Sequence, residues 1–272
     1  MCSKTKKRCR NCWPSYSSIF SEYCYSFLKQ NYYSSFRRKN QWETEIFNQG
    51  GTIPFSDEPP EREIRVTSKS MRESPLFMRN ALEISGKYGI PMLHKEMVAE
   101  PNIQLVACSD TRAHDREENL HKGVHFFVDD YRFQGIYNNP KKSLSRYAQY
   151  DFLLSPDFSL YADMPLWKQI ESVAKNRWVG AFWQNEGLKV IPTLSWSTAR
   201  SFEFCFDGVE TGASVAVGMI GCKKNRLGFM RGYAAMLDKL QPSQIIVFGT
   251  PFPEMEGNIV TVDYSASRKV VR

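Results

Sequence analysis

Aspartate residues follow several of the short apolar runs in this chain. Such runs are typical of buried strands, and the residues after them would lie at the carboxyl ends of the strands, where α/β proteins carry their functional sites. If these carboxylates converge, they could bind Mg²⁺ or Mn²⁺, or divide general acid and base roles. The alternative is structural, because aspartate also caps helices and closes turns. The candidate catalytic residues are Asp110, Asp129, Asp130, Asp157 and Asp207.

A second candidate site is the loop between a strand expected over residues 215–220 and a helix expected from residue 227. Gly221 permits close approach of a ligand to the backbone, and Lys223, Lys224 and Arg226 supply positive charge next to a helix N-terminus. This combination suits phosphate or a nucleic-acid backbone. The loop matches neither the P-loop pattern nor a dinucleotide-binding fingerprint. A simple solvated loop is the alternative.

The net charge of +7 belongs to the first 40 residues, which carry nine Lys/Arg and one acidic residue. The rest of the chain holds 27 basic and 28 acidic residues and is nearly neutral. A basic arm indicates an anionic partner, and the aromatic residues interleaved in it favour single-stranded nucleic acid. The alternative is that a helical stripe from Ile19 to Leu28 docks the arm on the body. The candidate nucleic-acid-binding residues of the arm are Arg8, Arg10, Arg37 and Arg38.

Cysteines and tryptophans offer two weaker signals. Four arm cysteines, which include one Cys-x-x-Cys pair, could hold a structural zinc ion, although a second pair is missing and free thiols are the alternative. They are Cys2, Cys9, Cys12 and Cys24. Trp183 and Trp196 are expected at strand ends, where indoles stack on bases or sugars, with burial in the core as the alternative.

Strand-like and helix-like segments alternate from residue 103 onward, which predicts an α/β protein with a mainly parallel sheet. We favour a compact, irregular, barrel-like closure of the sheet over an open doubly wound sheet. Strands are expected over residues 103–108, 125–128, 152–154, 179–183, 188–194, 202–206, 214–220, 245–248 and 259–262. Helices are expected over residues 115–122, 141–150, 165–176 and 227–240.

Three parts are expected along the chain: the basic, aromatic, cysteine-containing arm (1–40), a polar connection (41–75) and a single α/β domain (76–272). The composition, with 42% hydrophobic and 24% charged residues, excludes a wholly disordered chain. No window is apolar enough for a transmembrane helix, and the first residues lack the apolar stretch of a signal peptide. The odd number of cysteines, seven, suits a reducing compartment. We therefore expect a cytoplasmic protein without a membrane partner.

Several longer motifs resemble an uncharacterised bacterial and phage family, domain-of-unknown-function family 4417. The likeness spans roughly residues 90–264 and rests on the segments Asp151-Phe-Leu-Leu-Ser-Pro-Asp-Phe-Ser, Asn176-Arg-Trp-Val-Gly-Ala-Phe-Trp-Gln, Leu188-Lys-Val-Ile-Pro-Thr-Leu-Ser-Trp, Cys205-Phe-Asp-Gly and Val215-Ala-Val-Gly-Met-Ile-Gly. Members of this family occur largely in prophages, plasmids and other mobile elements. The resemblance implies an association with mobile genetic elements but does not indicate a chemical reaction. It marks as shared features Asp157, Asn176, Arg177, Trp196, Asp207 and Gly221.

Three functions follow as hypotheses. The first is an accessory protein of a phage or mobile element that binds nucleic acid through the arm and the loop after residue 220. The second is a metal-dependent phosphoesterase or nuclease that uses the strand-end aspartates. The third is a protein-binding factor whose partner is a host or element-encoded protein of a defence or replication complex.

Overall fold

The computed structural model describes residues 67–98 and 102–265. The predicted arm, its cysteines and most of the predicted connection lie outside these residues. The described chain belongs to one compact unit, Val66–Arg272.

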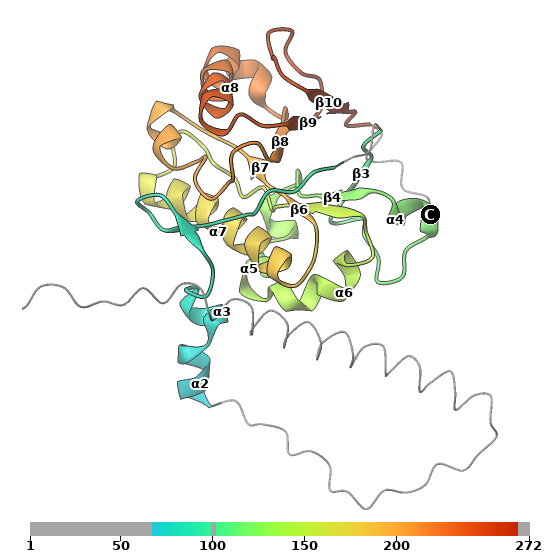
Figure 1. The fold of residues 1–272 in the computed structure, drawn as a ribbon, viewed down its shortest axis with the longest axis vertical. Coiled ribbons are helices and arrows are strands. Elements are labelled where there is room, and N and C mark those ends of the chain that lie inside the picture. Colours follow the sequence, from blue (N-terminus) through green and yellow to red (C-terminus); the bar gives the residue numbers. More distant parts are fainter. Residues whose placement is uncertain (1–66, 99–101, 266–272) are drawn as a thin grey trace, which may run out of the picture. The chain divides into compact units, whose positions relative to one another are not determined.

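Eight short parallel strands form two sheets that meet at a proline. One sheet has the order β3-β4-β5-β6 and the other β7-β8-β9-β10. Pro192 alone separates β6 from β7, and its carbonyl accepts a hydrogen bond from the amide of Ala216 in β8. The proline lacks an N–H group and so interrupts the ladder without ending the row of strands. The strands are β3 (Leu105–Ala107), β4 (Gly123–His125), β5 (Phe152–Leu154), β6 (Val190–Ile191), β7 (Thr193–Leu194), β8 (Ser214–Gly218), β9 (Gln244–Phe248) and β10 (Ile259–Val262) (Figure 1).

The row of strands curves so that distant strands touch. Phe127, just after β4, stacks on Phe248 of β9 with ring centroids 4.9 Å apart. The His125 ring lies 4.5 Å from the same Phe248 ring. In a flat sheet these strands would be about 19 Å apart, four strand spacings of about 4.8 Å. The side chains of the curved inner face pack against one another, since no residue of a helix belongs to their hydrophobic cluster. The buried residues of this cluster are Val98, Ile103, Leu105, Phe127, Phe152, Leu154, Ile191, Ala216, Ile246, Phe248 and Val262.

The helices cover the outer face of the curved sheet, where two further hydrophobic clusters combine strand residues with residues of α7 and α8. The strand order follows the chain order and has no switch point of the kind found in doubly wound sheets. The predicted parallel α/β sheet is confirmed. Its layout is barrel-like, although no strand pairing between β3 and β10 closes it within the described residues. The helices are α2 (Ser68–Glu73), α3 (Pro75–Met78), α4 (Glu117–Leu120), α5 (Gly135–Asn138), α6 (Leu144–Tyr147), α7 (Leu166–Asn185) and α8 (Arg226–Leu240).

Two predicted strands are wrong. The segment 179–183 lies inside α7, a helix of 20 residues that continues well beyond the predicted end at residue 176. Every residue from Asn176 to Ala181 is buried, so the apolar run shows no helical period and cannot be distinguished from a buried strand. The segment 202–206 belongs to the 3₁₀ helix η3 (Ala199–Glu203) and the turn after it. Its aromatic residues fill the core from a turn rather than from a strand.

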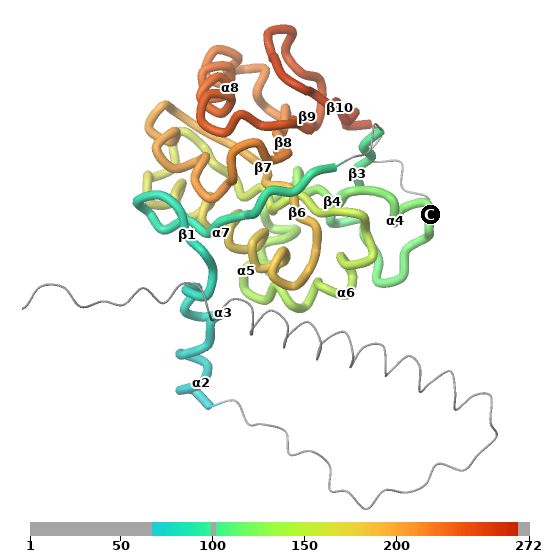
Figure 2. Tube along the Cα trace, in the orientation of Figure 1, coloured from blue at the N-terminus to red at the C-terminus, as the bar shows by residue number. Residues whose placement is uncertain are grey.

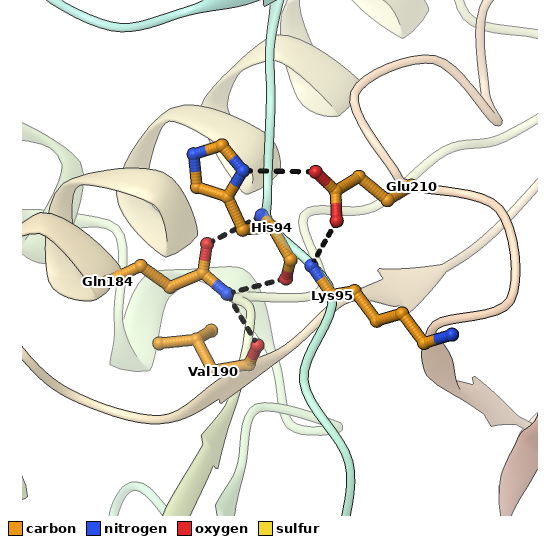
Figure 3. Close-up of polar contacts among 5 residues, drawn as sticks. All are labelled: His94, Lys95, Gln184, Val190 and Glu210. Atoms are coloured by element: carbon orange, nitrogen blue, oxygen red, sulfur yellow. Dashed lines mark hydrogen bonds and ion pairs between the residues drawn. The ribbon is translucent and has the colours of Figure 1, made fainter.

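Before the parallel strands, the chain forms a small antiparallel hairpin of β1 (Ile84–Ser85) and β2 (Ile90–Pro91). It then runs as an extended segment, residues 92–97, past α7 and β6 (Figure 2). We call this the clamped segment, because two side chains hold its backbone at the amino end of the sheet (Figure 3).

Gln184, near the end of α7, accepts a hydrogen bond from the amide of His94 (2.8 Å) and donates to the carbonyls of His94 (2.9 Å) and Val190 (3.1 Å). Glu210 accepts from the amide of Lys95 (2.6 Å) and pairs with Nδ1 of His94 (3.1 Å). These side chains complete the backbone hydrogen bonding of the segment, which also pairs Leu93 with Val209 in a parallel bridge and accepts at Glu96 from the amide of Ser214. The clamp occupies the amino end of the sheet, so the carboxyl end is the face to search for a site.

Candidate functional site

Four loops meet at the carboxyl end of the sheet around one carboxylate, Asp157, which follows β5. Asp130, from the loop after β4, and Ser195, directly after β7, both act on the proton affinity of its carboxyl group. The charge of Asp157 also raises the pKa of the Cys222 thiol, which lies in the loop after β8. Parallel strands bring their carboxyl ends to the same edge of a sheet, and the barrel-like curvature brings these ends around a centre. We call this set of loops the carboxyl rim.

Asp157 has an unusual proton affinity. Burial among these loops raises its pKa to about 7, and the neighbouring charge of Asp130 acts in the same direction. The hydrogen bond from Ser195 and the positive charge of Arg177 only partly oppose this change. A carboxyl group that titrates near neutral pH at the carboxyl end of a parallel sheet is a functional-site candidate.

Beneath Asp157, the guanidinium group of Arg177 in α7 is fully buried. It donates to the carbonyl oxygens of Thr193 (2.9 Å), Cys205 (3.0 Å) and Asp207 (3.1 Å). Arg177 therefore ties α7 to β7 and to the turn after η3. Burial lowers its pKa to about 10, so the side chain stays positively charged at neutral pH.

Asn176 completes this buried network. Its side-chain oxygen accepts from Ser155 (2.7 Å) and from Arg177, and its amide group donates to the carbonyl of Thr193 (3.2 Å). The residues around this network pack without room for a water molecule; they are Phe158, Ser172, Val173, Asn176, Arg177, Thr193, Ser195 and Cys205. The sequence resemblance marked Asn176 and Arg177 as shared features, and in the structure their hydrogen bonds join α7 to the residue after β5, to β7 and to the turn after η3.

The five candidate carboxylates do not form one site. Asp130 lies beside Asp157 and accepts two hydrogen bonds from Ser159, one from its amide (3.1 Å) and one from its hydroxyl (2.8 Å). Asp110 and Asp129 are exposed, and no recorded contact joins either to Asp157. In the part of the chain that the structure describes, no three His, Cys, Asp or Glu side chains are placed to hold a metal ion.

Asp207 was expected after a strand, but it follows the turn after η3. Its carboxylate pairs with Lys239 in the last turn of α8 (2.7 Å). Because α8 leads from the carboxyl end of β8 to the amino end of β9, this ion pair lies away from the carboxyl rim. The apolar segment 202–206 predicts a strand but forms part of η3 and the turn that contains Asp207.

The two candidate tryptophans are structural. Trp183 lies within α7 and is fully buried, so it is not available for stacking. Trp196 does follow β7, but its indole Nε1 donates to the carbonyl of Phe229 (3.1 Å) and its ring packs closely against Gly232 of α8. Neither indole lies free at the carboxyl rim.

Other aromatic side chains of the carboxyl rim are exposed. Tyr131 in the loop after β4 is 71% exposed, Tyr161 in the loop after β5 is 59% exposed, and Trp167 in the first turn of α7 is 67% exposed. A sequence signal was available for Tyr131, which stands between Asp130 and Arg132, but not for Tyr161, which stands between Leu160 and Ala162.

The predicted basic loop forms the short 3₁₀ helix η4 (Cys222–Asn225), which leads directly into α8. Gly221 before it has a φ of +79°, and a Cβ there would meet no atom within 4 Å. Asn225 caps α8 by accepting from the amide of Gly228 (3.2 Å). The glycine thus serves the left-handed turn that starts the helix.

Four exposed cations gather around the start of α8, and we call them the basic patch: Lys223, Lys224, Arg226 and Arg231. Arg226 pairs with Glu254, whereas the two lysines and Arg231 form no ion pair within the described residues. No acidic residue occurs in the sequence between Glu210 and Asp238. Cations at the positive end of a helix repel one another and the helix dipole, so an anion would be favoured here.

Within the described residues, no helix is long and apolar enough to cross a membrane. The candidate residues of the arm, including Arg8, Arg10, Arg37, Arg38 and the four cysteines of the predicted zinc site, lie outside the described residues.

Comparison with known proteins places the chain in a family. Over 177 residues it is 36% identical to the Gene 1 protein of Mycobacterium phage L5, covering 64% of this chain and 76% of that protein. It is 35% identical over the same length to the Gene 1 protein of Mycobacterium phage D29, of which it covers 65%. No solved structure matches the chain. These relatives are phage proteins, in agreement with the predicted association with phages. A family model described as "Domain of unknown function (DUF4417)" matches residues 82–265, and the chain belongs to this family.

Proposed function

We propose that this phage-associated protein binds nucleic acid through the basic patch at the carboxyl rim. The observation that carries the proposal is the group of cations at the start of α8, of which only Arg226 is in an ion pair within the described chain. Two exposed lysines beside a helix N-terminus offer mobile charges and backbone N–H groups to the same phosphate group.

The proposal predicts a salt-dependent affinity. Each phosphate that a lysine or arginine neutralises releases condensed counterions, so the logarithm of the association constant falls with the logarithm of salt concentration by about 0.9 per contact. Removal of two contacting lysines therefore lowers this slope by about 2.

The test is fluorescence anisotropy of labelled oligonucleotides with the full chain at two salt concentrations. The variant Lys223→Glu/Lys224→Glu is expected to bind at least about tenfold more weakly, with the reduced salt slope. The matched control is Lys141→Glu/Lys142→Glu, which makes the same charge change at exposed lysines between α5 and α6. Equal losses in both variants, or no binding by the unaltered chain, would refute the proposal.

The arm enters as a second contact of the same kind. Its arginines Arg8, Arg10, Arg37 and Arg38 carry much of the excess positive charge of the chain. Their combined replacement by glutamine should weaken binding and reduce the salt slope independently of the basic patch. Unchanged affinity would assign the arm to another role.

A protein partner is the second candidate function, favoured by exposed apolar side chains in α2, α3 and β1. Met71, Phe77, Met78 and Ile84 are all more than half exposed within a short stretch of chain. Such clustering is typical of a protein-binding surface. Co-purification from infected host cells, compared between the unaltered chain and Phe77→Ser/Met78→Ser, tests it: a partner lost only in the variant supports this function.

A further inference from the structure

We infer that the carboxyl rim takes single-stranded nucleic acid, with unpaired bases stacked on Tyr131, Tyr161 and Trp167. The inference rests on the proposed function and deepens it, because it names the class of nucleic acid and the side chains that distinguish it from duplex.

The three rings share one end of the sheet. Each stands on a segment that directly follows the carboxyl end of a strand, Tyr131 after β4 and both Tyr161 and Trp167 after β5. Each is more than half exposed, although exposure of large apolar rings to water is costly. Bases of a single strand offer both faces for stacking, whereas bases of a duplex are already stacked on one another.

The rings and the basic patch lie at the same end of the sheet, because they follow strands β4, β5 and β8 of one curved parallel row. The charge of Asp157 acts on the thiol of Cys222, which precedes Lys223. The charge of Asp130, which precedes Tyr131, acts on Asp157. A single strand whose phosphates lie on the patch would continue along this end of the sheet toward the rings.

Two of the rings have neighbouring contacts before any ligand binds. The Ser159 hydroxyl bonds to Asp130 (2.8 Å) and to the hydroxyl of Tyr161 (3.2 Å), so it links the two loops. The guanidinium of Arg132 lies 5.5 Å from the centre of the Tyr131 ring. Pre-positioned rings lose little conformational freedom when bases stack on them.

The carboxylates between the patch and the rings favour bases over phosphates. The carboxyl oxygens of Asp130 and Asp157 can accept hydrogen bonds from exocyclic amino groups of bases, whereas a phosphate group has no such donor to offer. The rim therefore divides into a cationic part suited to backbone and a part with carboxylates and rings suited to bases.

The experiment uses the full chain and four labelled probes of equal length: oligothymidine, oligouridine, an abasic strand with the same phosphates, and a DNA duplex. We expect oligothymidine and oligouridine to bind at least about tenfold more tightly than the abasic strand, from one or more stacked bases. Each of Tyr131→Ala, Tyr161→Ala and Trp167→Ala should weaken oligothymidine binding about fivefold or more and leave abasic binding unchanged. The control Phe77→Ala removes an equally exposed ring on α3 and should change neither.

The outcomes separate the two proposals. If the abasic strand binds as tightly as oligothymidine, if the duplex binds more tightly than both, or if the ring variants lose affinity for all probes alike, the stacking inference is overturned. Dependence of abasic binding on Lys223 and Lys224 would then leave the proposed function standing. If no probe binds, both fail. A difference between oligothymidine and oligouridine shows whether DNA or RNA is the better single strand.

Discussion

Replacement of the buried Arg177 by methionine should lower the stability of the domain substantially. Methionine matches the length of the aliphatic part but supplies no donors. The carbonyls of Cys205 and Asp207 would then lose their recorded hydrogen bonds from Nη2 and Nε. The carbonyl of Thr193 is less affected, because Asn176 also donates to it.

The magnitude follows from these orphaned acceptors. Each buried polar group left without a partner costs about 1–3 kcal/mol, so two carbonyls cost about 2–6 kcal/mol. Relief from burying a charge offsets part of this, since a buried cation is itself costly. We therefore expect a loss of about 3 kcal/mol, or about 6–12 °C in Tm for a domain of roughly 200 residues.

The assay is urea unfolding followed by far-UV circular dichroism, with thermal unfolding alongside. The control Arg231→Met removes an exposed arginine of α8 and should change stability by less than about 0.5 kcal/mol. If Arg177→Met is as stable as the unaltered chain, or more stable, the hydrogen bonds of the guanidinium do not hold α7 to the sheet and the reasoning is refuted.

Three further variants test other contacts. The Asp157 carboxyl keeps its proton up to about pH 7 when folded but loses it near 3.8 when unfolded, so the folded chain binds more protons in between and stability falls as pH rises from about 4 to 7. Asp157→Asn should remove this fall, which amounts to about 2 kcal/mol after allowance for partial exposure. The measurement is the free energy of urea unfolding of both chains across this pH range. An equal fall in the variant and in the unaltered chain would contradict the prediction. Gln184→Ala deletes three hydrogen bonds and should cost about 1–3 kcal/mol, with faster amide exchange confined to the clamped segment; uniform exchange would argue against the clamp. Gly232→Ala places a Cβ 2.2 Å from the Trp196 ring and should cost about 1–3 kcal/mol and shift tryptophan emission, whereas Gly135→Ala, with open space, should not.

Local patterns predicted much of the parallel sheet. Phe152–Leu154 and Ile259–Val262 are strands with the predicted bounds, and α8 begins one residue before the predicted helix at Leu227. These segments are apolar, short and bounded by turn-forming residues, which is a local signal. The basic patch was also visible, because a run of cations without acidic residues needs no tertiary information.

The tertiary structure decided which side chains meet. Because α7 is buried on almost every side, its sequence shows no helical period, and its last part was predicted as a strand. Trp183 therefore lies in the core and not at the predicted strand end. The turn after η3 moved Asp207 to an ion pair with Lys239.

The convergence of four loops on Asp157 arises from the chain-ordered, curved sheet, which brings residues 130, 157, 195 and 222 together. The sequence by itself determined most of the parallel strands, the helix that carries the basic patch and the family to which the chain belongs. Only the tertiary structure determined the carboxyl rim, because contacts between residues far apart in the chain depend on packing and leave no local period in the sequence.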